Sequence, residues 1–270
     1  MRTTSIFLIA IALIFAGCKK KDISDNASQS DGSGTQGQNI NPEQRQNALV
    51  LEYTATWCPY CGAWGHDSLT GITNHNGDRV VPVVCHVDDG LTSPCYNGLS
   101  ANYPDDQGIP NFIINEDRFL YEYQPSINSV LQRTPVAQTN FIIKKSGQSI
   151  NLTTQTKFFT AVSGADYYLA MYALEDGIDG ASGPYKQVIA SSHPAVPNYK
   201  HNHTLRAASC NNSALGAMIV CGTAASGTTI NSEYTINCPS DCNMANMTVA
   251  AIIWKKVGGV VTFVNAFEKK

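Results

Sequence analysis

The feature that most constrains the fold is a pair of cysteines two residues apart, placed shortly after an apolar run. Residues 48–53 (ALVLEY) are apolar and suited to a buried β-strand. The motif CPYC follows at residues 58–61, and apolar side chains then recur at helical spacing, although Gly65 and Gly71 weaken the helix. This order predicts an α/β unit that carries both cysteines in the turn between its strand and its helix.

Two later segments extend the pattern. Residues 80–87 (VVPVVCHV) predict a second buried strand, and residues 111–115 (NFIIN) predict a third, preceded by Gly108-Ile109-Pro110. Because Pro82 has no amide proton, we expect it at the start of its strand or beside an irregularity.

The order of strand, Trp-Cys-x-x-Cys turn, helix, strand and Ile-Pro before a further strand resembles thioredoxin. The resemblance implies that Cys58 is an attacking nucleophile and Cys61 a resolving thiol, with no cofactor. It implies that Glu52 is a buried acid that exchanges a proton with Cys61, and that Pro110 is the cis-proline facing the pair. The groove that receives a substrate would then be lined by Trp57, Pro59, Tyr60 and Ile109. The alternatives are a solvent-facing Glu52 and a disulfide that is only structural.

The N-terminus reads as a targeting segment. Arg2 precedes an apolar run at residues 6–15, too short to span a bilayer, and Ala16-Gly17-Cys18 follows. Small residues before a cysteine resemble the bacterial lipobox, which implies a signal peptide at 1–18 and a diacylated Cys18 that anchors the protein to a membrane. The alternative is an ordinary secretory signal. Residues 19–46 are polar and predict a flexible tether.

Eight cysteines remain once Cys18 is set aside, and an even number in an exported chain indicates disulfides. Their connectivity does not follow from the sequence, and pairing of nearest neighbours is the simplest hypothesis. The pairs would be Cys58–Cys61, Cys85–Cys95, Cys210–Cys221 and Cys238–Cys242. The alternative for the last four is a zinc site, which export to an oxidising compartment disfavours.

Residues 47–134 form the predicted thioredoxin-like domain, and from about residue 135 the pattern changes. Short β-type runs separated by Gly, Asn, Asp and Ser predict an all-β domain at 135–270, a β-sandwich of Ig-like type. The segments MYALEDGID (171–179) and HNHTLRAA (201–208) resemble the 28-kilodalton-type outer-membrane lipoprotein family of Bacteroidetes. That resemblance implies the same two-part architecture and an outer-membrane location, on the periplasmic face or the cell surface.

The net charge and the histidines say less about the function than the cysteines do. The formal net charge is −3 and there is no basic stripe, which argues against nucleic-acid binding. His201 and His203 would share one face of a strand and, with His193, suggest a metal site. Hydrogen-bonding histidines at a domain interface are the favoured interpretation, and we expect no metal.

Two functions remain. The first is an exported, membrane-anchored thiol–disulfide oxidoreductase acting on protein clients, with an unidentified redox partner. The second is a surface-binding lipoprotein in which the thioredoxin-like domain is a scaffold. The direction of the redox chemistry does not follow from the sequence.

Overall fold

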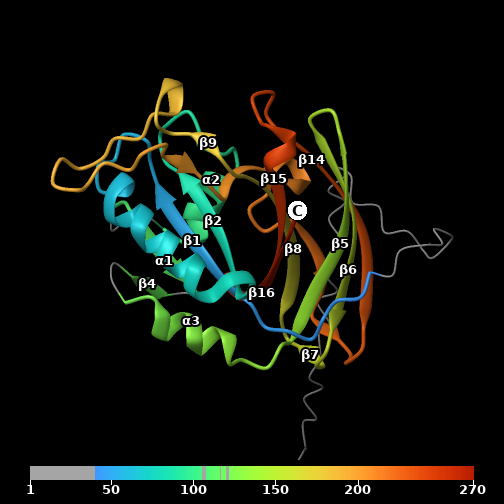
Figure 1. Ribbon diagram of the computed structural model, residues 1–270. Helices are drawn as coiled ribbons and strands as arrows, with labels where there is room; N and C mark the ends of the chain where they lie inside the picture. Colours follow the sequence, from blue (N-terminus) through green and yellow to red (C-terminus); the bar gives the residue numbers. More distant parts are fainter. Residues whose placement is uncertain (1–39, 105–107, 116, 120–121) are drawn as a thin grey trace, which may run out of the picture.

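A computed structural model describes residues 40–104, 108–115, 117–119 and 122–270 (Figure 1). Cys18, the signal peptide and most of the predicted tether lie outside the described residues. Within the described residues, no helix is both long enough and apolar enough to cross a bilayer.

Strands dominate the described part of the chain. The larger strands are β1 (Ala48–Thr54), β2 (Val80–His86), β3 (Asn111–Ile114), β4 (Asp117–Phe119), β5 (Ala137–Ser146), β6 (Ser149–Phe158), β8 (Asp166–Glu175), β11 (Thr204–Ala208), β12 (Ala217–Val220), β14 (Thr229–Asn237), β15 (Met247–Val257) and β16 (Val260–Lys269). Short two-residue strands are β7 (Val162–Ser163), β9 (Ile178–Asp179), β10 (Lys200–His201) and β13 (Thr223–Ala224). The helical elements are η1 (Cys61–Gly65), α1 (His66–Asn76), η2 (Gly77–Arg79), α2 (Tyr96–Asn102), α3 (Gln124–Leu131), η3 (Gly183–Tyr185), α4 (Ser209–Asn212) and η4 (Met244–Asn246).

One nine-stranded sheet runs through both predicted domains. Its order is β16-β15-β8-β11-β2-β1-β3-β4, with β12 paired to β8. β1 is parallel to β2 and antiparallel to β3, and β2 joins β11 in parallel through the pair Val84 and Thr204. The mixed α/β part and the β-rich part are therefore continuous through backbone hydrogen bonds.

Two of the shared strands are buried on both faces. In β8, Ala170, Tyr172 and Leu174 join the core formed with the N-terminal strands, whereas Leu169, Met171 and Ala173 join a second core. β15 alternates in the same way, as expected when successive side chains of a strand point to opposite faces. The second core is closed by the separate sheet β14-β6-β5, seen to the right of β8 and β15 in Figure 1.

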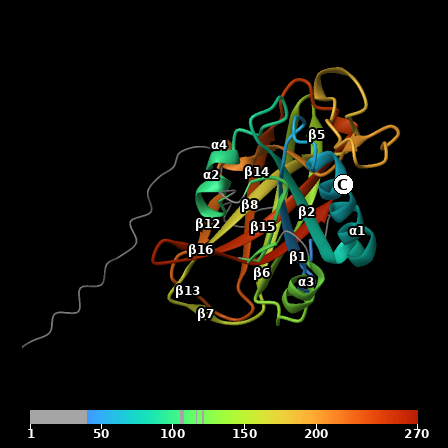
Figure 2. The ribbon, with the colours of Figure 1, turned by 90° about the vertical axis from the view of Figure 1, so that its left-hand side faces the viewer.

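The helices cover the N-terminal part of the long sheet. Figures 1 and 2 show α1 and α3 on one side of β1 and β2, and α2 on the other. Ile72 of α1, Leu99 of α2 and Ile127 of α3 are buried in the same core. This arrangement of helices around parallel β1 and β2 agrees with the predicted α/β unit.

Pro82 lies inside β2, as its third residue, rather than at the strand start. The backbone N–H of Val84 points toward the β11 side, where it donates to His203 O at 2.9 Å. Since alternate residues point the same way, the nitrogen of Pro82 faces that side too, where β11 has no paired residue. The missing proton therefore removes no ladder hydrogen bond.

Three of the four predicted disulfides are wrong. Cys238 and Cys242 are both buried thiols, so the bridge between them is not formed. Cys95 is a thiol that lies 3.2 Å from Ser93 Oγ, and Cys210 is a half-buried thiol, so the Cys85–Cys95 and Cys210–Cys221 bridges are absent. Cys85 and Cys95 pack in the main core and Cys210 packs against the second, where buried cysteines behave as small apolar side chains.

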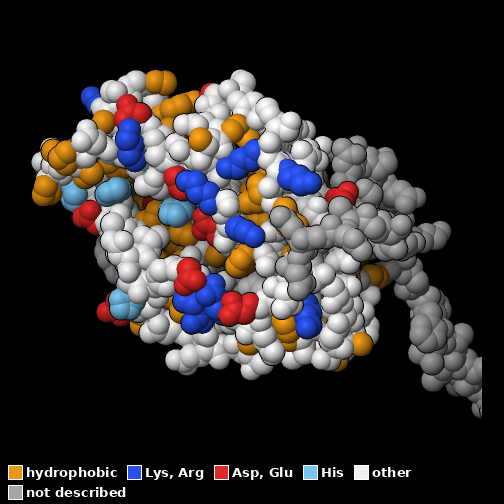
Figure 3. Space-filling model, turned by 45° about the vertical axis from the view of Figure 1, so that its right-hand side comes forward, with side chains coloured by type: hydrophobic (Ala, Val, Ile, Leu, Met, Phe, Trp, Pro, Cys, Tyr) orange, Lys and Arg blue, Asp and Glu red, His pale blue; other side chains and the backbone are white. Residues whose placement is uncertain are grey.

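The predicted tether ends before residue 46. Gln46 is 3% exposed, and its side-chain amide donates to Val264 O at 2.9 Å, while Asn47 donates to Ala266 O at the same distance. These bonds attach the start of the fold to β16. On the face shown in Figure 3, basic and acidic side chains are interspersed, so this face has no large field of one sign.

Candidate functional site

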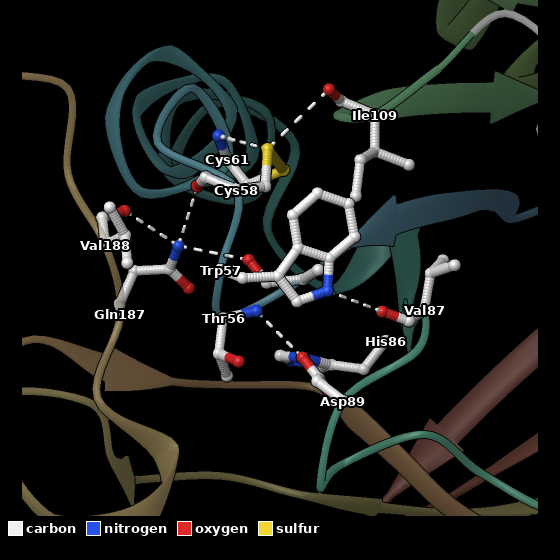
Figure 4. Close-up of a disulfide and its surroundings, with 11 residues drawn as sticks. Thr56, Trp57, Cys58, Cys61, His86, Val87, Asp89, Ile109, Gln187 and Val188 are labelled. Carbon is white, nitrogen blue, oxygen red and sulfur yellow. Dashed lines mark hydrogen bonds and ion pairs between the residues drawn. A yellow bond between two sulfur atoms is a disulfide. The ribbon is translucent and has the colours of Figure 1, made fainter.

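Cys58 and Cys61 form a disulfide just below the surface, in the turn that follows β1 (Figure 4). Both cysteines are buried, at 3% and 1% exposed, whereas the neighbouring Trp57 and Tyr60 are 52% and 60% exposed. The predicted pairing of these two cysteines is confirmed. Pro59 is exposed as well, so three of the four predicted groove residues surround the pair at the surface.

The fourth groove residue and the predicted cis-proline lie on the other flank of the disulfide. The Ile109–Pro110 peptide bond is cis, which confirms that prediction. Ile109 O lies 3.6 Å from Cys58 Sγ, and the backbone N–H of Cys61 donates to the same sulfur at 3.1 Å. The carbonyl of Ile109 is thus next to the sulfur that would form a mixed disulfide with a client.

The helix after the pair does not begin where the sequence pattern suggested. Residues 61–65 form the π-type turn η1, in which Gly65 N donates to Tyr60 O, and α1 begins at His66. Ala63 has non-helical dihedral angles (φ −108°, ψ −106°). Cys58 therefore precedes an irregular turn, and the backbone N–H of Cys61 is the helix-end donor that reaches its sulfur.

Glu52 lies beneath this turn. It is 3% exposed, and its burial raises the pKa of the carboxyl well above the ordinary value. Gly65 explains the close approach, because a Cβ there would lie 3.0 Å from Pro110 and 3.5 Å from Glu52 Oε1. The structure thus places Glu52, Pro110 and the turn that begins at Cys61 together, and Glu52 does not face solvent.

Replacing Glu52 with glutamine should change how stability depends on pH. The unfolded carboxyl ionises near its ordinary pKa of about 4.3, whereas the folded one stays protonated to higher pH. Wild-type stability should therefore fall as the pH rises from about 4.3 to the folded pKa, at about 1.4 kcal/mol for each unit of difference. In denaturant titrations from pH 4 to 9, Glu52→Gln should gain stability relative to wild type across this window.

The control for that titration is Glu233→Gln, which changes an exposed carboxylate on β14. The free energy of unfolding of Glu233→Gln should differ from that of wild type by the same amount across this pH range. If the free energy of unfolding of Glu52→Gln differs from that of wild type by the same amount at every pH, the Glu52 carboxyl binds protons equally well in the folded and unfolded states. That result would contradict the prediction.

A buried carboxylate at the end of β2 holds the chain just before the disulfide. Asp89 Oδ2 accepts the Thr56 N–H at 2.7 Å and lies 2.7 Å from His86 Nδ1. Burial would raise the pKa of Asp89, but the bonds from His86, Thr56 and Leu91 outweigh it and leave the pKa below the ordinary value. Trp57 Nε1 donates to Val87 O at 3.3 Å, which fixes the exposed indole (Figure 4).

A segment from the β-rich part covers one flank of the motif. This covering segment, residues 185–193, lies beside the start of α1 at the upper left of Figure 1. Gln187, which is 4% exposed, donates through Nε2 to Ala55 O at 3.1 Å and to Cys58 O at 2.9 Å. Two backbone bonds continue the contact: Val188 N to Thr56 O at 2.8 Å and Ala190 N to Pro59 O at 3.0 Å.

Gly62 permits this contact, since a Cβ there would lie 2.4 Å from Val188 O and 2.7 Å from Gln187 Cγ. At its far end, the covering segment reaches α1, where His193 Nε2 lies 2.9 Å from Asp67 Oδ2. Ile109 lies on the other side of the pair from Gln187 and Val188 (Figure 4). The covering segment therefore holds one side of the motif, and the carbonyl of Ile109 lies on the other.

The histidines of the β-rich part do not form the predicted pair on one face. His201 is buried in β10 against Tyr199 and His86, with ring centroids 5.1 and 5.0 Å apart. Burial, and then repulsion by His86, lowers the pKa of His201 to about 4. His203 adopts a positive φ of 53°, which turns it out of the strand, and its Nδ1 lies 3.8 Å from Asp176 and Glu268. His201 thus lies where the two parts of the chain meet.

Sequence reasoning missed Asp89, His86 and Gln187. Asp89 carried a weak signal, because it follows a buried strand and precedes Gly90. Gln187 carried none, because its partner Cys58 is 129 positions away in the chain.

Comparisons with known proteins relate this chain to a protein family and to solved structures. A family model described as "Outer membrane protein Omp28" matches residues 108–267. A search of the curated proteins gives no significant match. Among solved structures, HBP35 of Porphyromonas gingivalis is similar in fold, with a TM-score of 0.65 and 17% identity over 85% of this chain and 76% of that chain. The sporulation control protein Spo0M of Bacillus subtilis aligns with a TM-score of 0.29 and 12% identity, over 50% of this chain and 47% of that one, too low to support an argument.

Proposed function

We propose that this chain, which belongs to the Omp28 family of outer membrane proteins, carries out thiol–disulfide exchange through Cys58 and Cys61. The observation that carries the proposal is the placement of a disulfide between an exposed aromatic rim and the Ile109–Pro110 segment, with Glu52 buried beneath. A bridge that only staples the chain requires neither the buried acid nor the exposed aromatic rim.

The chemistry starts from the oxidised pair seen in the structure. A client thiolate attacks Cys58 Sγ, forming a mixed disulfide and releasing Cys61 as a thiolate. Glu52, whose pKa is raised by burial, is the buried acid placed to supply the proton that Cys61 takes up. A second client thiolate then attacks the client sulfur and releases Cys58, so that the client loses two electrons and the pair gains them. The reverse sequence reduces a client disulfide, with Cys58 as the nucleophile.

Replacing Cys61 with serine tests this role. Cys58 can still attack a disulfide, but no resolving thiol remains, so covalent adducts should accumulate. On a non-reducing gel of cells producing Cys61→Ser, we expect client bands of higher mass that disappear with reductant. A chain lacking both cysteines (Cys58→Ser, Cys61→Ser) is the matched control and should show none. The absence of adducts, together with a Cys58 thiol no more acidic than the roughly 8.5 of a free thiol, would contradict the proposal.

A second candidate function is binding at the outer membrane by the β-rich part, with the first part as a scaffold. The family match favours it, because the match begins at residue 108 and leaves out Cys58 and Cys61. Under this candidate, the layer β14-β6-β5 and the strands β8 and β15 form a β-sandwich of Ig-like type that presents loops to a ligand. The Cys61→Ser experiment separates the two candidates, since binding without exchange leaves no covalent adduct.

We also propose that Cys18 carries the membrane anchor. The apolar run ending in Ala16-Gly17-Cys18 supports it, as does membership of an outer-membrane family. Mass spectrometry of the mature protein should find Cys18 as an acylated N-terminal residue, and Cys18→Ser should release the protein from membranes. A mature N-terminus that begins elsewhere without lipid would contradict this assignment.

A further inference from the structure

A second pair of cysteines lies close together outside the site described above. Cys238 and Cys242 sit in the connection between β14 and β15, and their thiols are hydrogen-bonded to each other. Both are thiols in this structure, so the predicted Cys238–Cys242 bridge is not formed. They are 8% and 6% exposed. The two thiols are therefore neighbours and can act together as a dithiol.

The backbone around the pair fixes its spacing. Cys242 N donates to Pro239 O at 3.1 Å, which closes a tight turn over the two sulfurs. Cys238 N donates to Gln148 O at 2.8 Å, and the side chain of Gln148 donates to Ser240 O at the same distance. The turn is thereby attached to the β5–β6 hairpin, while Ser240 and Asp241 at its tip are exposed. The two cysteines therefore lie beneath the exposed tip of a turn at the surface.

Two cations face the pair. Arg206 is 4% exposed and forms ion pairs with Glu175 and, at 2.6 Å, with Asp241 in the turn. Lys145 Nζ donates to the carbonyls of Met244 and Met247 at 2.9 and 2.8 Å. These contacts hold the buried guanidinium of Arg206 and the exposed ammonium of Lys145 near the turn, and both positive charges favour the thiolate form of Cys238.

The two thiols are not equivalent. The hydrogen bond from Cys242 is the main cause that lowers the pKa of Cys238, helped by Arg206 and Lys145 and opposed by burial and Glu175. The pKa of Cys242 is raised, first by the same hydrogen bond and then by burial. Cys238 is thus the more acidic of the two thiols and Cys242 the less acidic, which is the asymmetry of an attacking and a resolving thiol.

We propose that Cys238 and Cys242 are a second redox-active pair whose substrate is a disulfide. The Cys238 thiolate attacks one sulfur of the substrate, forming a mixed disulfide and releasing the other sulfur as a thiolate. Cys242 then loses its proton and attacks Cys238, which displaces the remaining substrate sulfur and leaves a Cys238–Cys242 disulfide. The pair loses two electrons and the proton of Cys242, and the substrate disulfide takes up the two electrons and that proton to become one thiol and one thiolate.

The test uses glutathione as the disulfide, in folded full-length chain with Cys58→Ser and Cys61→Ser, so that its outcome does not depend on the first pair. Alkylation and peptide mass spectrometry across buffers of reduced and oxidised glutathione should show Cys238–Cys242 passing reversibly between dithiol and disulfide. A disulfide that is reduced only after unfolding, or thiols that stay reduced in every buffer, would overturn the proposal.

Single substitutions assign the attacking sulfur. In the same background, Cys242→Ser should accumulate a glutathione adduct on Cys238, and Cys238→Ser should give much less on Cys242. Cys210, a half-buried thiol whose pKa is raised by burial, is the internal reference. Adduct on Cys238 should form roughly tenfold faster than on Cys210, because thiolate fraction sets the rate. A faster reaction at Cys210 would show that exposure alone decides and would overturn the assignment.

Discussion

Replacing Cys58 with serine should reduce the rate of disulfide exchange roughly a thousandfold or more, to the uncatalysed background. The hydroxyl of serine does not form a mixed disulfide, and in the proposed mechanism Cys61 acts only on a mixed disulfide that Cys58 has already formed. The assay is reduction of a model protein disulfide by chain that has been reduced beforehand. It is made with Cys238 and Cys242 both replaced by serine, so that only one pair contributes.

The matched control is Cys210→Ser, which removes a half-buried thiol outside the motif. It should leave the rate within about twofold of the parent. Equal rates for the parent and Cys58→Ser would remove Cys58 from the chemistry and would leave the β-rich part as the working region.

The glycine before β12 should be the most sensitive glycine in the described part of the chain. Gly216 has a positive φ of 71°, and a Cβ there would lie 1.9 Å from Leu169 O and 2.6 Å from Ala170 Cα, both in the backbone of β8. Alanine therefore suffers the left-handed conformation, about 1–2 kcal/mol, and forces β12 away from β8, a further 1–3 kcal/mol or so. Denaturant unfolding of Gly216→Ala should show a loss of about 2–5 kcal/mol.

Gly222 provides the matched control for that experiment. Its φ is 73°, yet a Cβ there would meet nothing within 4 Å. Gly222→Ala should therefore lose only the conformational cost of about 1–2 kcal/mol. The difference between the two variants isolates the overlap with β8. If both variants lose the same free energy of unfolding, the close approach of Gly216 to β8 does not affect stability, which would contradict the prediction.

The sequence predicted the strands more reliably than their partners. The buried strands β1 and β2 are continuous apolar runs, so their positions followed from the pattern. The pairing of β2 with β11 had no local signal, since it joins Val84 to the distant Thr204. For that reason the sequence did not predict that one sheet joins the mixed α/β part to the β-rich part.

The candidate site was also only partly predictable from the sequence. The residues that the motif itself specifies are where the resemblance to thioredoxin implied: Cys58 bonded to Cys61, Glu52 buried beneath them, and Pro110 in the cis form. Their chemical roles remain predictions. Gln187 was missed because a single glutamine in a loop has no pattern, and its function depends on carbonyls that folding alone brings within reach.

The continuous sheet has a consequence for how the disulfide is oriented. Domains joined by a linker swing about a hinge, and a redox domain of that kind can search the space around it. Here β2 is joined to β11, and Gln187 of the covering segment is joined to Cys58, so a hinge between the two parts would have to break backbone pairing. The disulfide therefore keeps a fixed direction relative to the β-rich part. Under the proposed thiol–disulfide exchange, a client would have to meet the disulfide in an orientation that the β-rich part sets.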